Sequence, residues 1–241
     1  MRGERVVITG RGVMSPMGHD WDTTWSGLLE GRSAVEEVTL FDASALPWRY
    51  AAEVKDFDPQ AHIRPKKLAP YLPRAVQLAI PATRMALKDS GLSIDATDPT
   101  RVGVLIGSST DSLCLRQLEI QESLDHERDP YFAKQRRLPL LDPKDFFRNN
   151  YQMASCVVAQ LFGALGYNMT VHTACAAGAQ AIGEAARLIA RGGADVVLSG
   201  GCDSLIDAVG MTGFGQQSLG GVDITRHEGQ LGIIRMNLRH M

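Results

Sequence analysis

Cys175 is the residue of this sequence whose neighbours most favour covalent chemistry. It follows the strand-like segment Val171-His172-Thr173 and precedes the small residues Ala176-Ala177-Gly178. This pattern predicts that a buried strand turns into a helix at Cys175. A helix N-terminus carries unpaired N–H groups and partial positive charge, which stabilise a thiolate, and small neighbours leave space for a substrate. Such a thiolate is suited to take up an acyl group as a thioester.

The other cysteines, Cys114, Cys156 and Cys202, have no such context, and each is expected to be a free and usually buried thiol. Spacing alone leaves an alternative open for Cys175 as well, because a cysteine between alanines more often fills space in a core. No two cysteines form C-x-x-C, and no paired Cys/His cluster occurs. The sequence therefore predicts no structural metal site.

Several polar and apolar residues near these segments have two interpretations. His172 lies three residues before Cys175, and residues three apart in a strand point to opposite faces. This favours a packed or interface histidine over a catalytic partner. Asp203 follows a strand end, where it could orient another group or be solvated in a loop. Met211 and Phe214 could line an acyl tunnel, although core packing is the more common role for each.

Glycine-rich segments after the predicted strands do not form nucleotide motifs. Gly10-Arg11-Gly12 is followed by Ser15, where a dinucleotide-binding motif needs its third glycine, so a tight turn is the better interpretation. Gly107-Ser108-Ser109 and Ser199-Gly200-Gly201 lack the lysine of a phosphate-binding loop and are interpreted as ordinary strand exits. No G-x-S-x-G is present, which argues against a serine hydrolase. No nucleotide cofactor is expected.

Composition excludes several classes of partner. The chain has 241 residues, with 25 Lys and Arg against 27 Asp and Glu and a formal net charge of -2. Nucleic-acid-binding proteins usually show a basic excess or stripe, so no nucleic-acid partner is expected. No apolar run approaches the roughly 20 residues that cross a bilayer, and the first residues do not form a signal peptide. We therefore expect a cytoplasmic globular protein with no membrane partner.

Strands and helices alternate along the chain. Buried strands are predicted over 5–9, 102–106, 169–173 and 194–199, and helices over 21–29, 73–90, 151–165 and 177–191. Asp20 is expected to cap the first helix and Gly31 to end it, whereas Pro81 is expected to kink or split the second. This alternation predicts an α/β fold with a mainly parallel sheet covered by helices on both faces.

Three parts of the chain lack a clear pattern. Residues 33–67 are interpreted as an irregular peripheral excursion, and residues 116–148 as a second excursion with broken helices. Residues 215–241 show no sustained periodicity, and only a weak strand over 231–234 is predicted there. We therefore expect one domain over residues 1–214 and a divergent tail of unassigned structure over residues 215–241.

Five segments, in order along the chain, carry a family resemblance. They are VVITGRGVMSPMG, WSGLLEGRSAV, AIPATRMALKDSGL, RVGVLIGSS and GYNMTVHTACAAGAQAIGEAARLIARGGADVVLSGGCDSL. From Arg5 to about Phe214 the chain resembles the N-terminal half of a β-ketoacyl-acyl-carrier-protein synthase. The resemblance is to the elongating type used in fatty acid and polyketide synthesis. The segments around Ser15 and Cys175 sit closer to these synthases than to thiolases proper.

The resemblance implies a fold and a chemistry. The family has the thiolase-like fold, in which two similar halves sandwich shared helices between their sheets, and it forms homodimers. Cys175 matches the nucleophile that accepts an acyl chain from the phosphopantetheine arm of acyl carrier protein. Malonyl-carrier protein then loses carbon dioxide, and the carbanion attacks the thioester to give a 3-oxoacyl product. The nucleophile's own N–H is one oxyanion-hole donor in the family, and no metal or redox cofactor is implied.

The sequence also departs from the family. Members are much longer, and their two catalytic histidines and supporting lysine lie in the C-terminal half. His227 and His240 match neither histidine context, so they receive no role. We expect the N-terminal half of a synthase, truncated or disrupted in frame, that is acylated weakly at Cys175 but does not complete condensation alone. Exposed apolar helix faces are expected for the same reason.

An alternative from another class stays open. Non-catalytic thiolase-like subunits pair with a complete synthase, as chain-length partners do in polyketide systems. Cys175 weakens this interpretation, because such partners usually lack the nucleophile, whereas the absent histidines strengthen it. The basic pairs Lys66-Lys67 and Arg136-Arg137 could dock an acidic carrier protein, although short basic pairs are usually a solvated face. The sequence does not indicate acyl chain length or choose between the two pathways.

Overall fold

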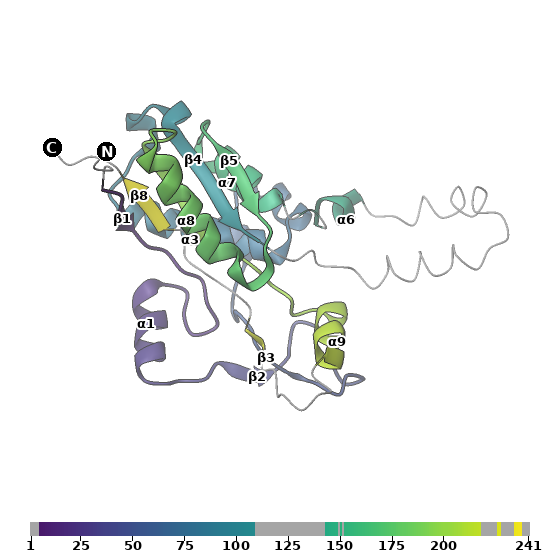
Figure 1. The fold of residues 1–241 in the computed structure, drawn as a ribbon. Coiled ribbons are helices and arrows are strands. Elements are labelled where there is room, and N and C mark those ends of the chain that lie inside the picture. Colours follow the sequence, from purple (N-terminus) through teal and green to yellow (C-terminus); the bar gives the residue numbers. More distant parts are fainter. Residues whose placement is uncertain are drawn as a thin grey trace, which may run out of the picture.

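The computed structural model describes residues 5–108, 143–148, 150, 152–217, 226–227 and 234–237 (Figure 1). Its helices are α1 (Trp21–Leu29), α2 (Pro59–His62), α3 (Arg74–Asp89), α6 (Pro143–Arg148), α7 (Met153–Phe162), α8 (Ala177–Ala190) and α9 (Ala208–Gln217). Short 3-10 turns are η1 (Lys66–Tyr71), η2 (Ile94–Ala96), η3 (Pro99–Arg101) and η5 (Ala174–Ala176). The strands are β1 (Val7–Gly10), β2 (Val35–Glu37), β3 (Tyr50–Ala52), β4 (Val102–Gly107), β5 (Asn168–Val171), β6 (Val196–Gly201), β7 (Arg226–His227) and β8 (Ile234–Asn237).

A five-stranded sheet forms the centre of the fold, in the order β1-β8-β6-β4-β5. Strand β4 pairs in parallel with β5 and β6, whereas β8 runs antiparallel to both β6 and β1. Every residue of β4 and β6 is buried. The predicted α/β fold with a mainly parallel sheet is confirmed.

Helices cover both faces of this sheet, and alternate residues of β4 show how. Val104 and Ile106 belong to the core cluster that includes residues of α3 and α7, such as Ile80 and Val158. Leu105, between them, packs in a separate cluster with α8 (Figure 1). Successive side chains of a strand point to opposite faces, so these two clusters lie on opposite sides of the sheet.

One prediction about the first half of the chain is wrong, and of the two effects predicted for Pro81, a kink or a split, the split does not occur. The first strand is not fully buried, because Ile8 is 54% exposed on β1, which is an edge strand with β8 as its single neighbour. Helix α3 is not split at Pro81 and runs unbroken from Arg74 to Asp89. Pro81 is buried between Ile80 and Ala82, and their burial offsets the hydrogen bond that the proline removes.

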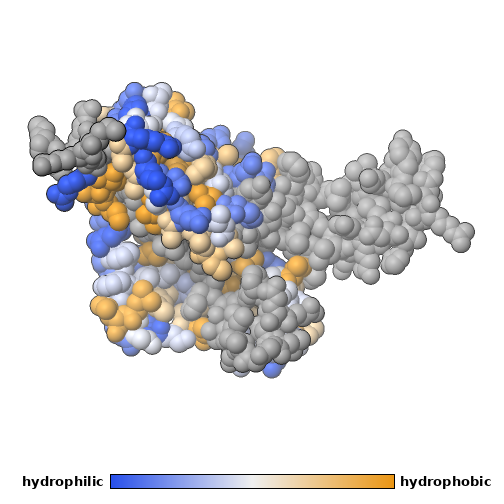
Figure 2. All heavy atoms as spheres, viewed as in Figure 1, coloured by the Kyte–Doolittle hydropathy of each residue, from blue (hydrophilic) through white to orange (hydrophobic). Residues whose placement is uncertain are grey.

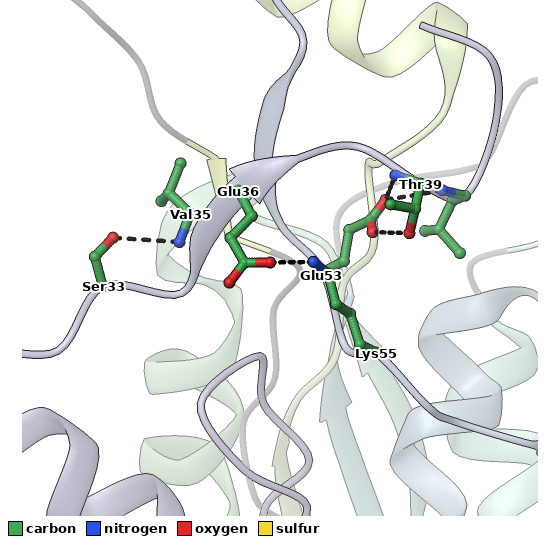
Figure 3. A network of polar contacts seen from close by, with 7 residues as sticks. Ser33, Val35, Glu36, Thr39, Glu53 and Lys55 are labelled. Carbon is green, nitrogen blue, oxygen red and sulfur yellow. Dashed lines mark hydrogen bonds and ion pairs between the residues drawn. The ribbon is translucent and has the colours of Figure 1, made fainter.

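Residues 33–67, predicted to be irregular, contain a small second sheet. Strand β2 pairs antiparallel with β3, and β3 pairs in parallel with β7. The carboxylate of Glu53, 3% exposed, accepts hydrogen bonds from the N–H groups of Thr39 and Leu40 at 2.8 and 3.0 Å and from the Thr39 hydroxyl at 2.7 Å (Figure 3). Glu36 pairs with Lys55 nearby. These contacts fix the loop that follows β2.

The end of the chain contributes elements that the sequence pattern did not indicate. Helix α9 crosses position 214, and β8 overlaps the predicted weak strand 231–234 only at Ile234. The proposed domain boundary at 214 therefore falls inside a helix. Residues 116–142, with Cys114 before them, lie outside the described residues.

Helix α1 presents apolar side chains at the surface. Trp25, Leu28 and Leu29 are 48%, 53% and 72% exposed, and Figure 2 shows apolar residues gathered over this helix. The ring of Trp25 stacks on that of Trp21, with centroids 5.7 Å apart. The expected exposure of an apolar helix face is confirmed here. Within the described parts of the chain, no helix has the length and apolar character needed to cross a membrane.

Asp20 caps α1 as predicted, and replacing it is expected to destabilise the fold. Its carboxylate accepts a hydrogen bond from the Thr23 N–H at 2.8 Å. Asp20→Ala should lower the free energy of unfolding by about 1 kcal/mol, measured by urea denaturation. Asp20→Asn is the matched control, because an amide oxygen keeps the cap.

The same pair of variants distinguishes the stability contributed by the Asp20 charge from that contributed by the capping hydrogen bond. Hydrogen bonds from the backbone and side chain of Thr23 hold the pKa of Asp20 below its ordinary value. A depressed pKa means that the charge contributes stability above the ordinary value of about 3.9 and loses it as pH falls through the folded-state pKa. The difference between wild type and Asp20→Asn should therefore shrink in acid. An Asp20→Ala protein as stable as wild type at pH 7 would contradict the cap.

Candidate active site

Cys175 lies in a single turn between a strand of the central sheet and a long helix. Strand β5 ends at Val171, the 3-10 turn η5 spans Ala174–Ala176, and α8 begins at Ala177. The Cys175 side chain is exposed and its thiol is free. The predicted position at a strand-to-helix junction is confirmed, and the alternative that this cysteine fills space in the core is not supported.

A strained residue precedes the cysteine. Ala174 has φ +50°, in the left-handed region that residues with a Cβ rarely adopt. This conformation costs about 1 kcal/mol for an alanine and is found most often where a turn presents a functional group. Here it reverses the chain between His172 and α8 and leaves the Cys175 side chain at the surface.

The backbone N–H groups around Cys175 differ in whether they already have an acceptor. Ala176 donates its N–H to the carbonyl of Thr173 at 3.2 Å, and Ala177 donates to that of Ala174. No hydrogen bond between described residues uses the Cys175 N–H, and no described side chain caps α8. The Cys175 N–H, for which the described residues supply no acceptor, can therefore face a negative charge on an acyl oxygen bound to the sulfur.

The other described cysteines lack this combination. Cys202 follows β6 and is 4% exposed, and its burial, followed by the charge of Asp203, raises the pKa of its thiol. A hydrogen bond with Ser108 opposes this shift but is the smaller effect, so Cys202 stays a neutral thiol. Cys156 is exposed, so its predicted burial is wrong, and it lies within α7 rather than ahead of a helix.

His172 binds backbone at the end of the sheet. Its ring Nδ1 lies 2.8 Å from the carbonyl oxygen of Ser108 and donates to it, which ties the segment after β5 to the end of β4. This contact agrees with the structural role that the sequence favoured for His172. Met211 is 4% exposed and packs with Val38 and Ile206, which agrees with core packing.

Other residues that the sequence analysis named have no described contact with Cys175. The side chains of Phe214 and His227 and all of His240, Arg136 and Arg137 fall outside the described residues, and Lys66 and Lys67 are exposed on η1. Among the described residues, no group of three His, Cys, Asp or Glu side chains is placed to hold a metal ion.

The sequence did not indicate the residues that contact the helix after the Cys175 turn. Gly107 and Gly201, interpreted as ordinary strand exits, both contact the first turn of α8. Their pattern in the sequence gives no sign of this contact, since it depends on three segments that are far apart along the chain.

Comparison with known proteins identifies the class to which this fold and this cysteine belong. Residues 3–227 match the family described as beta-ketoacyl synthase, N-terminal domain, and the chain belongs to that family. The predicted thiolase-like fold is confirmed by solved ketosynthases of the same architecture.

Three individual proteins illustrate the similarity and how much of each is covered. The 3-oxoacyl-[acyl-carrier-protein] synthase 2 of Coxiella burnetii is 36% identical over 214 residues, which is 89% of this chain and 49% of the relative. The enzyme of the same name from Staphylococcus aureus strain COL is 35% identical over 216 residues, 88% of this chain and 49% of its own. The ishigamide ketosynthase/chain length factor has a TM-score of 0.76 at 29% identity, covering 98% of this chain and 59% of that one. The chain thus spans about half the length of the curated relatives it matches.

Native alkylation should distinguish the three described thiols. With iodoacetamide at pH 7.5, Cys175 should react about tenfold faster than Cys156, because it lies in an exposed turn ahead of a helix, whereas Cys156 lies within α7. Cys202 should react only after denaturation, since it is buried and its pKa is raised. Peptide mapping by mass spectrometry gives the rate at each site. Labelling spread evenly over all cysteines would contradict the assignment of a special environment to Cys175.

Proposed function

We propose that this chain carries the acyl-accepting half of a β-ketoacyl synthase, with Cys175 as the nucleophile. The thiolate attacks the carbonyl carbon of an acyl thioester borne on the phosphopantetheine arm of acyl carrier protein. A new carbon–sulfur bond forms to Cys175, and the bond to the pantetheine sulfur breaks. The pantetheine thiolate leaves and takes up a proton from solvent. The acyl chain is then held as a thioester on the enzyme.

The observation that carries this proposal is the exposed Cys175 at the start of α8, within a chain that belongs to the β-ketoacyl synthase family. The strained Ala174 presents the sulfur, and the amide of Cys175 supplies a donor that the described residues do not use. The Cys175 N–H would stabilise the oxyanion of the tetrahedral intermediate.

In this proposal, the condensation step requires both halves of a synthase. Loss of carbon dioxide from a malonyl group on carrier protein gives a carbanion, which attacks the Cys175 thioester and releases a 3-oxoacyl product. The enolate and the protons of this step need stabilising groups, each worth orders of magnitude in rate. We assign these groups to the second half of a synthase and the acylation step to the residues described here. The setting would be fatty acid or polyketide synthesis in the cytoplasm, with no metal or diffusible cofactor.

The proposed partners follow from the same chemistry. Acyl carrier protein delivers the acyl group, and the exposed Lys66 and Lys67 on η1 supply positive charge for an acidic carrier. One of the solved ketosynthases with this fold is described in complex with a type II polyketide acyl-carrier protein. A homodimer, or a heterodimer with a related synthase, is the proposed assembly.

A second candidate function is that of a non-catalytic partner subunit. It is favoured by the similarity to the ishigamide ketosynthase/chain length factor. Co-purification with an active synthase whose turnover does not change when Cys175→Ala is introduced would support this candidate. Loss of turnover in that complex would support the nucleophile instead.

Acylation of the purified chain tests the proposed function. Incubation with an octanoyl-pantetheine thioester should add one octanoyl group, seen in the intact mass and mapped to the peptide that contains Cys175. Cys175→Ala should abolish the adduct, and Cys156→Ala, the matched control on an exposed cysteine of α7, should leave it unchanged. Acylation that survives in Cys175→Ala would overturn the proposal.

Charge reversal on η1 should weaken carrier binding without affecting the chemistry. The double variant Lys66→Glu/Lys67→Glu should raise KM for an acyl carrier protein substrate about fivefold, because like charges then face the acidic carrier. The rate with the small pantetheine thioester should not change. Lys88→Glu, an exposed site on α3, is the control. Equal KM values for both variants would place the carrier elsewhere.

A further inference from the structure

Three glycines let the first turn of α8 lie directly against the ends of two strands. Gly107 ends β4, Gly201 ends β6, and Gly178 is the second residue of α8. A Cβ atom added to Gly107 would lie 2.3 Å from the carbonyl carbon of Ala177 and 2.4 Å from the amide nitrogen of Gly178. A Cβ on Gly201 would lie 3.1 Å from the Cα of Gly178. Backbone therefore meets backbone at this point.

The close approach, and not an unusual backbone conformation, is what requires glycine here. None of the three has φ in the left-handed region, unlike Gly163 and Gly192, which end α7 and α8. A methyl group at Gly107 would have to displace backbone atoms of α8. One at Gly201 would need a shift of a few tenths of an ångström.

The remainder of α8 rests on the sheet in a different way. Farther along the helix, Leu188 and Ile189 pack on Leu105 and Val197 through their side chains. Side-chain contacts can adjust by small rotations, whereas two backbones in contact cannot. The height of the first turn above the sheet is therefore set by the glycine contact.

We propose that Gly107 and Gly201, which contact α8 at Ala177 and Gly178, are positioning residues that fix the height of the Cys175 sulfur for attack on the acyl donor. Cys175 lies in the turn η5, which runs directly into α8 three residues before Gly178. A shift of the first turn of α8 therefore moves the sulfur with it. This proposal rests on the proposed function, because it concerns the same acylation step.

Two reactions of Cys175 respond differently to such a shift. Alkylation by iodoacetamide needs only an exposed thiolate beside the helix amides, which move together with the sulfur. Acylation needs the sulfur at a fixed place relative to a bound thioester, and a misplacement of about 1 Å can cost a hundredfold in rate. The ratio of the acylation rate to the alkylation rate therefore reports the position of the Cys175 sulfur. Loss of the folded structure would lower both rates instead.

A graded series of alanine variants tests the proposal. Added Cβ atoms would meet their nearest neighbours at 3.1 Å in Gly201→Ala, at 3.4 Å in Gly178→Ala and at 3.8 Å in Gly183→Ala. Gly183 is on α8 and faces only the Arg187 side chain, so its variant controls for stiffening of the helix. Octanoylation and iodoacetamide alkylation of Cys175 are measured for each variant, together with Tm.

The acylation rate should fall in the variant whose added Cβ lies closer than an ordinary contact. We expect Gly201→Ala to be about tenfold slower than wild type, and Gly178→Ala and Gly183→Ala to stay within about twofold of it, with alkylation within about twofold throughout. Equal acylation rates in Gly201→Ala and Gly183→Ala would overturn the proposal, as would an equal loss of both reactions. If Gly201→Ala does not fold at the assay temperature, Gly201→Ala and Gly183→Ala are compared at a lower temperature by the same criteria. A wild-type chain that is not acylated at Cys175 would instead remove the proposed function, and this proposal with it.

Discussion

The contact between the backbone of α8 and the ends of β4 and β6 is the constraint on which the arrangement around Cys175 depends. Parallel strands bring their carboxyl ends to one edge of the sheet, and β4, β5 and β6 all end at the edge where α8 begins. Glycine at the end of β4 and at the end of β6 lets the helix come down onto that edge. The start of α8 and the exposed Cys175 side chain therefore lie next to each other at this edge of the sheet.

Environment, and not residue type, separates the cysteines of this fold. Cys175 and Cys202 both follow a strand of the central sheet, Cys202 directly after β6 and Cys175 a few residues after β5. After β6 the chain continues into packed structure, so Cys202 is buried and its thiol is held neutral. After β5 the left-handed Ala174 reverses the chain and leaves Cys175 outside. The same chemical group is inert in one place and available in the other.

The parts of this structure that the sequence predicted are those determined by local patterns. The continuous apolar runs of β4 and β6 and the small residues after Cys175 belong to segments of a few residues, and the cap at Asp20 depends on one neighbour. Strands β2 and β3 were missed because three residues are too few for an alternating pattern. The exposure of Ile8 and the unbroken helix at Pro81 depend on tertiary packing, and the glycine contact joins residues about 70 and 23 positions apart from Gly178.

A crystal structure of the chain after acylation by a pantetheine thioester tests the central claim most directly. The account predicts that the acyl carbonyl carbon is bonded to Sγ of Cys175. It also predicts that the acyl oxygen lies about 3 Å from the Cys175 amide nitrogen, where the start of α8 can stabilise negative charge. An acyl group on another side chain, or an acyl oxygen turned away from that amide, would contradict it.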